Sequence, residues 1–163
     1  MAGNPVRVRT GGLRELGFAI EKLSRKTQTT IARSALAAGG RVFAKEMRQR
    51  VPVLDEATAQ RNPGTVKKNI RVRVLRPVKA GEMQAVIGIR SLTGKQLKSW
   101  RKSSGQKGAA NPDDPFYWYF VEFGTNKMAA QPFVRPSFDT KKEEAAARTK
   151  EQLKTRIEQE AGK

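Results

Sequence analysis

The sequence predicts an α+β fold with N-terminal helices, an antiparallel β-sheet, a C-terminal helix and a long basic loop. Apolar residues recur at helical spacing towards both ends of the chain, and they alternate with charged residues in its middle. A chain of 163 residues can bury one substantial core, whereas two would be cramped. We therefore expect residues 1–163 to form a single domain with its core at about residues 13–150.

Two helices are expected in the N-terminal third. The apolar positions of the first are Leu13, Leu16, Ile20 and Leu23, and those of the second are Ile31, Ala35, Ala38, Val42 and Met47. Pro52 ends the second pattern. Gly39 and Gly40 lie inside it, and each costs a helix about 1 kcal/mol relative to alanine. The pair therefore predicts a kink or a close crossing of two helices.

The spacing of apolar residues changes to two at residue 70. Ile70, Val72 and Val74 alternate with Arg71 and Arg73, which predicts a half-buried strand with arginines on its exposed face. A turn at residues 77–81 and a second apolar stretch at 83–90 complete an antiparallel hairpin. We expect a sheet from roughly residue 66 to 90, with one or two further strands elsewhere.

Residues 94–112 show no clear periodicity and are rich in Gly, Ser, Lys and Asn. This composition predicts a flexible basic loop, either mobile on the surface or ordered by a partner. A final helix is expected over residues 136–160, with Pro136 at its first position.

The formal charge of +18 indicates a polyanionic partner, an acidic protein partner or a place in a larger assembly. Residues 61–107 hold 13 Lys or Arg and one acidic residue, so most of the excess lies in one region. Nucleic-acid contact is one open hypothesis, because basic side chains neutralise phosphates and an aromatic ring among them stacks on bases. The candidates are Lys95, Lys98, Trp100, Arg101 and Lys102. A charged surface that is only solvated is the alternative.

The chain contains no cysteine and no histidine, which excludes disulfides, thiolate metal sites and the commonest general base. We find no catalytic constellation, and we expect no enzymatic activity, no cofactor and no metal. No run of about eighteen apolar residues occurs, so no membrane span is expected. The start of the chain lacks the apolar stretch of a signal peptide, so synthesis and use in a cytoplasm are expected.

Residues 117–139 read YWYFVEFGTNKMAAQPFVRPSFD and hold an unusual concentration of aromatic side chains. The block Glu122-Phe123-Gly124-Thr125, followed by Pro132-Phe133 and Arg135-Pro136, resembles a motif of the gene-product-ten-like neck or tail-completion proteins of long-tailed bacteriophages. The resemblance extends more loosely upstream, to Val51-Pro52 and to residues 63–70, and covers roughly residues 13–150.

This resemblance implies a structural virion protein that forms a ring of six or twelve copies at the head-proximal end of the tail. Its implied partners are further copies of itself, the neighbouring head-closure and tail-terminator proteins, and phage DNA in the lumen. It implies assembly in the host cytoplasm, and no membrane. Within such a ring we expect Arg71 and Arg73 at subunit contacts and the cations of residues 94–112 near DNA. The alternative function is a basic nucleic-acid-binding protein outside any virion.

The motif also has a physical interpretation. Gly124 can adopt the positive φ that reverses the chain, Thr125 can cap the next turn of the backbone, and Pro132 and Pro136 stiffen the return. Glu122 lies among aromatic residues and requires a partner, for which Arg135 is the candidate. We expect the aromatic cluster to form the core against which the hairpin and helices pack.

Overall fold

The computed structural model describes residues 17, 20–21, 23–58, 61–76 and 82–161. The helix expected over residues 13–23 lies mostly outside these ranges and stays a prediction. The α+β class is confirmed: long helices combine with a small antiparallel sheet and a C-terminal helix.

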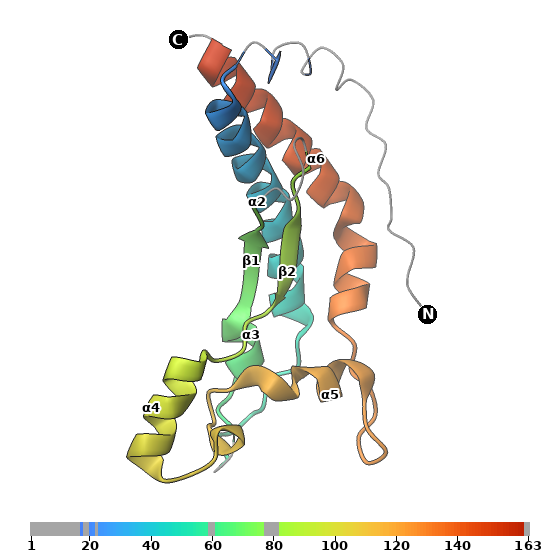
Figure 1. Ribbon diagram of the computed structural model, residues 1–163. Coiled ribbons are helices and arrows are strands. Elements are labelled where there is room, and N and C mark those ends of the chain that lie inside the picture. The colour runs from blue at the N-terminus through green and yellow to red at the C-terminus, as the bar shows by residue number, and fades with distance from the viewer. Residues whose placement is uncertain (1–16, 18–19, 22, 59–60, 77–81, 162–163) are drawn as a thin grey trace.

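Two long helices lie side by side and form the main axis of the molecule (Figure 1). Helix α2 (Arg25–Arg50) begins at Ser24, whose hydroxyl accepts a hydrogen bond from the Thr27 amide, and ends just before Val51-Pro52. Helix α6 (Val134–Ala161) is the C-terminal helix. It begins two residues earlier than predicted. Pro136 therefore lies within the first turn, where its missing N–H breaks no helical hydrogen bond.

The glycine pair of α2 produces a close crossing, as predicted. A Cβ on Gly39 would lie 2.0 Å from Thr149 Oγ1 and 2.8 Å from the Ala145 carbonyl oxygen, both on α6. A Cβ on Gly40 would lie 2.5 Å from Val72 Cγ1 on the sheet. The two glycines thus let α6 and the sheet each approach the α2 backbone directly.

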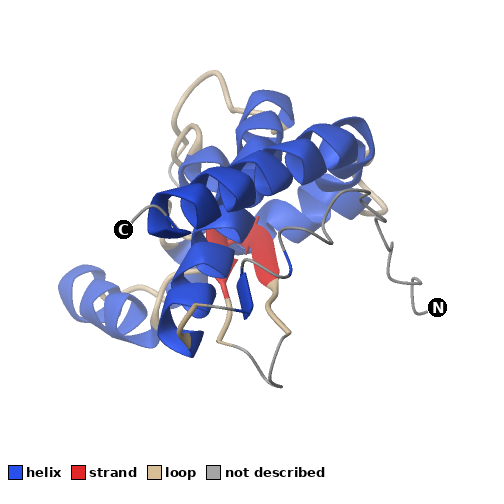
Figure 2. Ribbon diagram, turned by 90° about the horizontal axis from the view of Figure 1, so that it is seen from above, coloured by secondary structure: helices blue, strands red, loops and turns tan. Residues whose placement is uncertain are grey.

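The sheet is the predicted hairpin. Strand β1 (Ile70–Val74) pairs antiparallel with β2 (Ala85–Ile89), from Ile70 opposite Ile89 to Val74 opposite Ala85. Ile70 is fully buried, and Arg71 and Arg73 are exposed, as the alternation predicted. Seen from above, the strands lie against the helical layer (Figure 2).

The sheet is smaller than expected. The described residues contain no further strand, and residues 65–69 form the short helix α3 (Thr65–Asn69). Gly64, with φ +71°, turns the chain into that helix. One face of the hairpin packs on α2, so burying its apolar residues requires no additional strand.

The prediction of a structureless loop over residues 94–112 is wrong for its first part. Helix α4 (Gly94–Ser104) starts at a capping box, in which Thr93 and Gln96 each bind the other's backbone N–H. It ends at Gly105, which has φ +69°. Strong caps and good helix-forming residues therefore outweighed the polar composition. A 3₁₀ turn follows at Gly108–Ala110, and α4 extends away from the long helix pair (Figure 1).

The main core lies where the end of α2, α3, β1 and the start of α6 meet. Its buried apolar residues are Ala44, Met47, Val51, Val66, Ile70 and Phe133. Helix α5 (Trp118–Phe123), preceded by a 3₁₀ turn at Pro115–Tyr117, packs along this end of the molecule.

Candidate functional site

A buried carboxylate joins α5 to α6. Glu122 is only 6% exposed, and its two carboxylate oxygens accept hydrogen bonds from three successive backbone amides. The donor amides belong to Phe133 (2.8 Å), Val134 (3.0 Å) and Arg135 (3.3 Å). They belong to the residue before α6 and to its first two residues, where a negative charge is favourable. The expected partner Arg135 therefore contributes its backbone N–H, and its exposed guanidinium forms no ion pair with Glu122 in the described part of the chain.

The chain between the two helices reverses at Gly124. Its φ is +75°, as predicted, and a Cβ there would lie 2.8 Å from the Ala130 nitrogen. Thr125 and Met128 exchange backbone hydrogen bonds, and the Thr125 hydroxyl accepts one from the Lys127 amide. The exposed Pro132 then leads into the fully buried Phe133. The block that resembles the phage motif is thus a rigid helix, turn and helix start.

The prediction that the aromatic cluster forms the core is wrong for four of its members. Phe116, Tyr119, Phe120 and Phe123 are between 37% and 59% exposed. Tyr119 contacts the rings of Phe120 and Phe123, with centroids 6.3 Å and 4.6 Å apart. Tyr117, Trp118 and Val121 turn inward against the core instead. The four outward side chains are called the aromatic face below.

A groove of about 420 Å³ lies on the inward side of α5. Its mainly apolar lining includes Val53, Leu54, Tyr117, Val121 and Met128. Val53 and Leu54 are exposed although apolar. This surface is called the apolar groove below.

Arg61 lies beside the apolar groove and orders its rim. The Arg61 guanidinium is 4.9 Å from the centroid of the Phe116 ring and 4.8 Å from that of Tyr117. Burial raises the pKa of the Tyr117 phenol above its ordinary value, an effect that Arg61 and a hydrogen bond with Thr65 oppose. The groove is therefore bounded by an organised cation–π arrangement.

The basic residues singled out in the sequence lie on two elements, the hairpin and α4. Arg71 and Arg73 line an open groove of about 650 Å³ on the exposed face of the hairpin, together with Arg90. Lys95, Lys98 and Lys102 are exposed on α4.

Arg101, about one helical turn from Lys98, and Trp100 were expected to act with these lysines. Arg101 is directed towards Gly108, with Nε 3.8 Å from the position of a Cβ there, and the indole nitrogen of Trp100 is buried. Sequence reasoning missed Arg90. Strand alternation could have indicated it, because Arg90 lies two residues beyond Gly88 and therefore on the same face of the hairpin.

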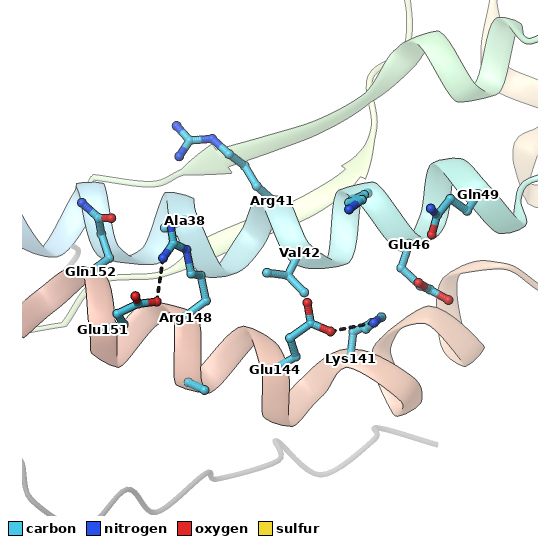
Figure 3. Close-up of a pocket in the computed structure, with 12 residues that line it drawn as sticks. Ala38, Arg41, Val42, Glu46, Gln49, Lys141, Glu144, Arg148, Glu151 and Gln152 are labelled. Atoms are coloured by element: carbon cyan, nitrogen blue, oxygen red, sulfur yellow. Dashed lines mark hydrogen bonds and ion pairs between the residues drawn. The ribbon is translucent and has the colours of Figure 1, made fainter.

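A groove of about 830 Å³ runs between α2 and α6 (Figure 3). Its charged side chains are mostly paired on α6, where Lys141 contacts Glu144 and Arg148 contacts Glu151, each at 2.6 Å. The hydrogen bond and charge of Glu144 raise the pKa of Lys141. Pairs at this spacing are typical of solvated helix surfaces, so this groove offers no distinctive chemistry.

Neither a metal cluster nor a membrane helix occurs in the described part of the chain. No group of three or more acidic, His or Cys side chains is placed to hold a metal ion there. No described helix is long and apolar enough to cross a bilayer.

Fold and surfaces together define a basic α+β protein whose prominent surface features are an aromatic face, an apolar groove and exposed basic residues. The chain belongs to the HK97-gp10-like family of phage proteins, described as "Bacteriophage HK97-gp10, putative tail-component", which it matches over residues 14–124. No curated protein and no solved structure matches it.

Membership of a tail-component family implies a place in the virion and contact with other virion proteins, and it favours a structural role over an enzymatic one. The matched range contains α2, the hairpin, α4 and α5 and ends at Gly124. Helix α6 lies beyond it.

Proposed function

We propose that the protein is a subunit of a homo-oligomeric ring at the head-proximal end of the phage tail, joining the tail to the DNA-filled head. The observation that carries this proposal is the pair of apolar surfaces that flank α5, the outward aromatic face and the inward apolar groove. The ring contains six or twelve copies, is assembled in the host cytoplasm, and contacts head-closure and tail-terminator proteins above and below.

The aromatic face is large enough to require a partner. Four half-exposed rings, each with about 150–250 Å² of surface, leave on the order of 400 Å² of apolar area uncovered. Patches of this size on a monomer mark interaction sites. Clustered aromatic side chains are also the usual anchors of protein interfaces.

A second copy of the same chain is the occupant that the geometry favours. A ring closes through a heterologous contact, in which one patch on each subunit meets a different patch on the next. The aromatic face and the apolar groove meet this requirement, because both are apolar and, apart from Phe116 in the preceding 3₁₀ turn, they lie on different sides of α5. Glu122 and the Gly124 turn hold α5 rigidly, so association costs little ordering entropy.

Two single substitutions test this contact. Phe123→Asp places a charge in the aromatic face, and Leu54→Asp places one in the apolar groove. Both residues are exposed, so circular dichroism should show an unchanged fold. Each variant alone should remain monomeric where the parent chain forms rings, as measured by native mass spectrometry.

Mixing the two variants gives the decisive result. The Leu54→Asp chain keeps an intact aromatic face, and the Phe123→Asp chain keeps an intact groove, so one good contact forms and no second can follow. The mixture should therefore contain heterodimers and no rings. Rings formed by either variant alone, or by the mixture, would contradict the proposed contact.

A further inference from the structure

Three arginines share the exposed face of the hairpin. In the register of the sheet, Arg71 lies opposite Gly88 and Arg73 lies opposite Val86. Arg90 follows Gly88 by two residues, so its side chain lies on the same face of the hairpin as those of Arg71 and Arg73. All three line the 650 Å³ hairpin groove, in which no acidic residue takes part, and a Cβ on Gly88 would meet nothing within 4 Å. The groove is open and positively charged.

Helix α4 begins at the end of this groove. Thr93 lines the end of the hairpin groove and is also the N-cap of α4. At about 100° per residue, Lys95, Lys98 and Lys102 fall within a sector of roughly 60° on α4. Leu97 and Arg101 lie on the side that faces Gly108. One side of α4 is therefore anchored, and the other displays three lysines.

These six cations lack acidic partners among the described residues. The salt bridges found there all lie within α2 or within α6. Arg71 donates hydrogen bonds to the carbonyl oxygens of Lys68 and Ile70, which orient its guanidinium without neutralising it. The sequence from Met83 to Pro112 contains no Asp or Glu.

We infer that the hairpin groove and the lysine side of α4 form one binding surface for the phosphate backbone of duplex DNA. The cations are arranged along two successive elements, which fits an extended polyanion better than a single small anion. Lysine is depleted at protein–protein interfaces, whereas arginine is enriched there. The three lysines of α4 therefore make an acidic protein the weaker match for the surface as a whole. The choice of DNA rests on the proposed function, since a ring between head and tail surrounds the path of the genome.

Salt dependence of DNA binding tests the inference. One variant carries Arg71→Gln, Arg73→Gln and Arg90→Gln, and a second carries Lys95→Gln, Lys98→Gln and Lys102→Gln. A control carries Lys26→Gln, Arg33→Gln and Lys142→Gln, three exposed cations on α2 and α6. Affinity for a short duplex DNA of mixed sequence is measured against salt for each, with circular dichroism to verify folding.

Each phosphate contact on duplex DNA contributes about 0.9 to the slope of log affinity against log salt. Each test variant should therefore flatten the slope by up to about 2.7, and the control should retain the parent slope. Test variants that match the control would overturn the inference. The triple arginine variant could instead keep the parent slope and no longer form rings. That result would overturn DNA binding by the arginines and would place them at a subunit contact.

Ring formation is measured separately on the same samples. If the parent chain binds DNA as a monomer and the test variants flatten its salt slope, this inference stands and the ring proposal fails. If the parent chain forms rings that have no affinity for DNA, the ring proposal stands and this inference fails.

Discussion

At the level of single residues, Glu122 shows how a charge becomes necessary inside an apolar environment. Three amides at the start of α6 have no helical acceptor, and the Glu122 carboxylate supplies one. Its burial is therefore compensated by charge-assisted hydrogen bonds. The same contacts fix the orientation of α5, and with it the aromatic face.

Replacing Glu122 by glutamine should lower the free energy of unfolding by about 1–3 kcal/mol, because the charge and one acceptor oxygen are lost at buried amides. Urea denaturation measures the change. Glu143→Gln, at an exposed position of α6, is the control and should change stability by less than about 0.5 kcal/mol. Equal stabilities of the two variants would show that Glu122 is not a structural cap.

Gly124→Val should also destabilise the fold. A β-branched side chain at φ +75° costs of order 1–3 kcal/mol, and its Cβ would also collide with the backbone of Met128 and Ala130. Gly64→Val is the matched control, because Gly64 has φ +71° but open space around it. Thermal denaturation should show a larger loss at Gly124, and melting like the parent would refute this account of the turn.

At the level of secondary-structure elements, the packing of α2 against α6 depends on Gly39. Gly39→Ala should separate the two helices and destabilise the protein by about 1–3 kcal/mol, as overpacking does. Thr149→Ala removes the nearest obstructing atom but leaves the Ala145 carbonyl in place, so the double variant should recover part of the loss.

A double-mutant cycle measures this coupling, which should exceed about 0.5 kcal/mol. Gly94→Ala, where a Cβ meets nothing within 4 Å, is the control. Strict additivity of the Gly39 and Thr149 effects would mean that the two residues do not limit the helix crossing.

For the whole molecule, the proposed ring has a consequence for the virus. Deleting the gene should leave heads and tails assembled but unjoined, as seen by electron microscopy of lysates. The parent gene supplied in trans should restore joined particles, and the Phe123→Asp gene should not. Normal infectious particles without the protein would remove the neck function, while family membership would still stand.

Much of the fold could be predicted because the relevant information is local. The alternation of Ile70, Arg71 and Val72 predicted a strand exposed on one face, and helical spacing with Pro52 as terminator predicted α2. Gly124 marked a positive φ. The α4 error was avoidable in part, because Thr93 and Gln96 have the spacing of a capping box.

The candidate sites were less predictable, because they depend on residues distant in sequence. The sequence showed that aromatic side chains cluster here, but not whether Phe116, Tyr119, Phe120 and Phe123 face the core or the solvent. The apolar groove is formed by α5 together with residues 52–55. The hairpin groove depends on the strand register, which places Gly88 opposite Arg71 and so brings Arg90 to the same face. Local preferences thus determined α2, the hairpin, the C-terminal helix and the reversal at Gly124. Only packing against α2, α3 and α6 decided which side chains were buried and which were left for a partner.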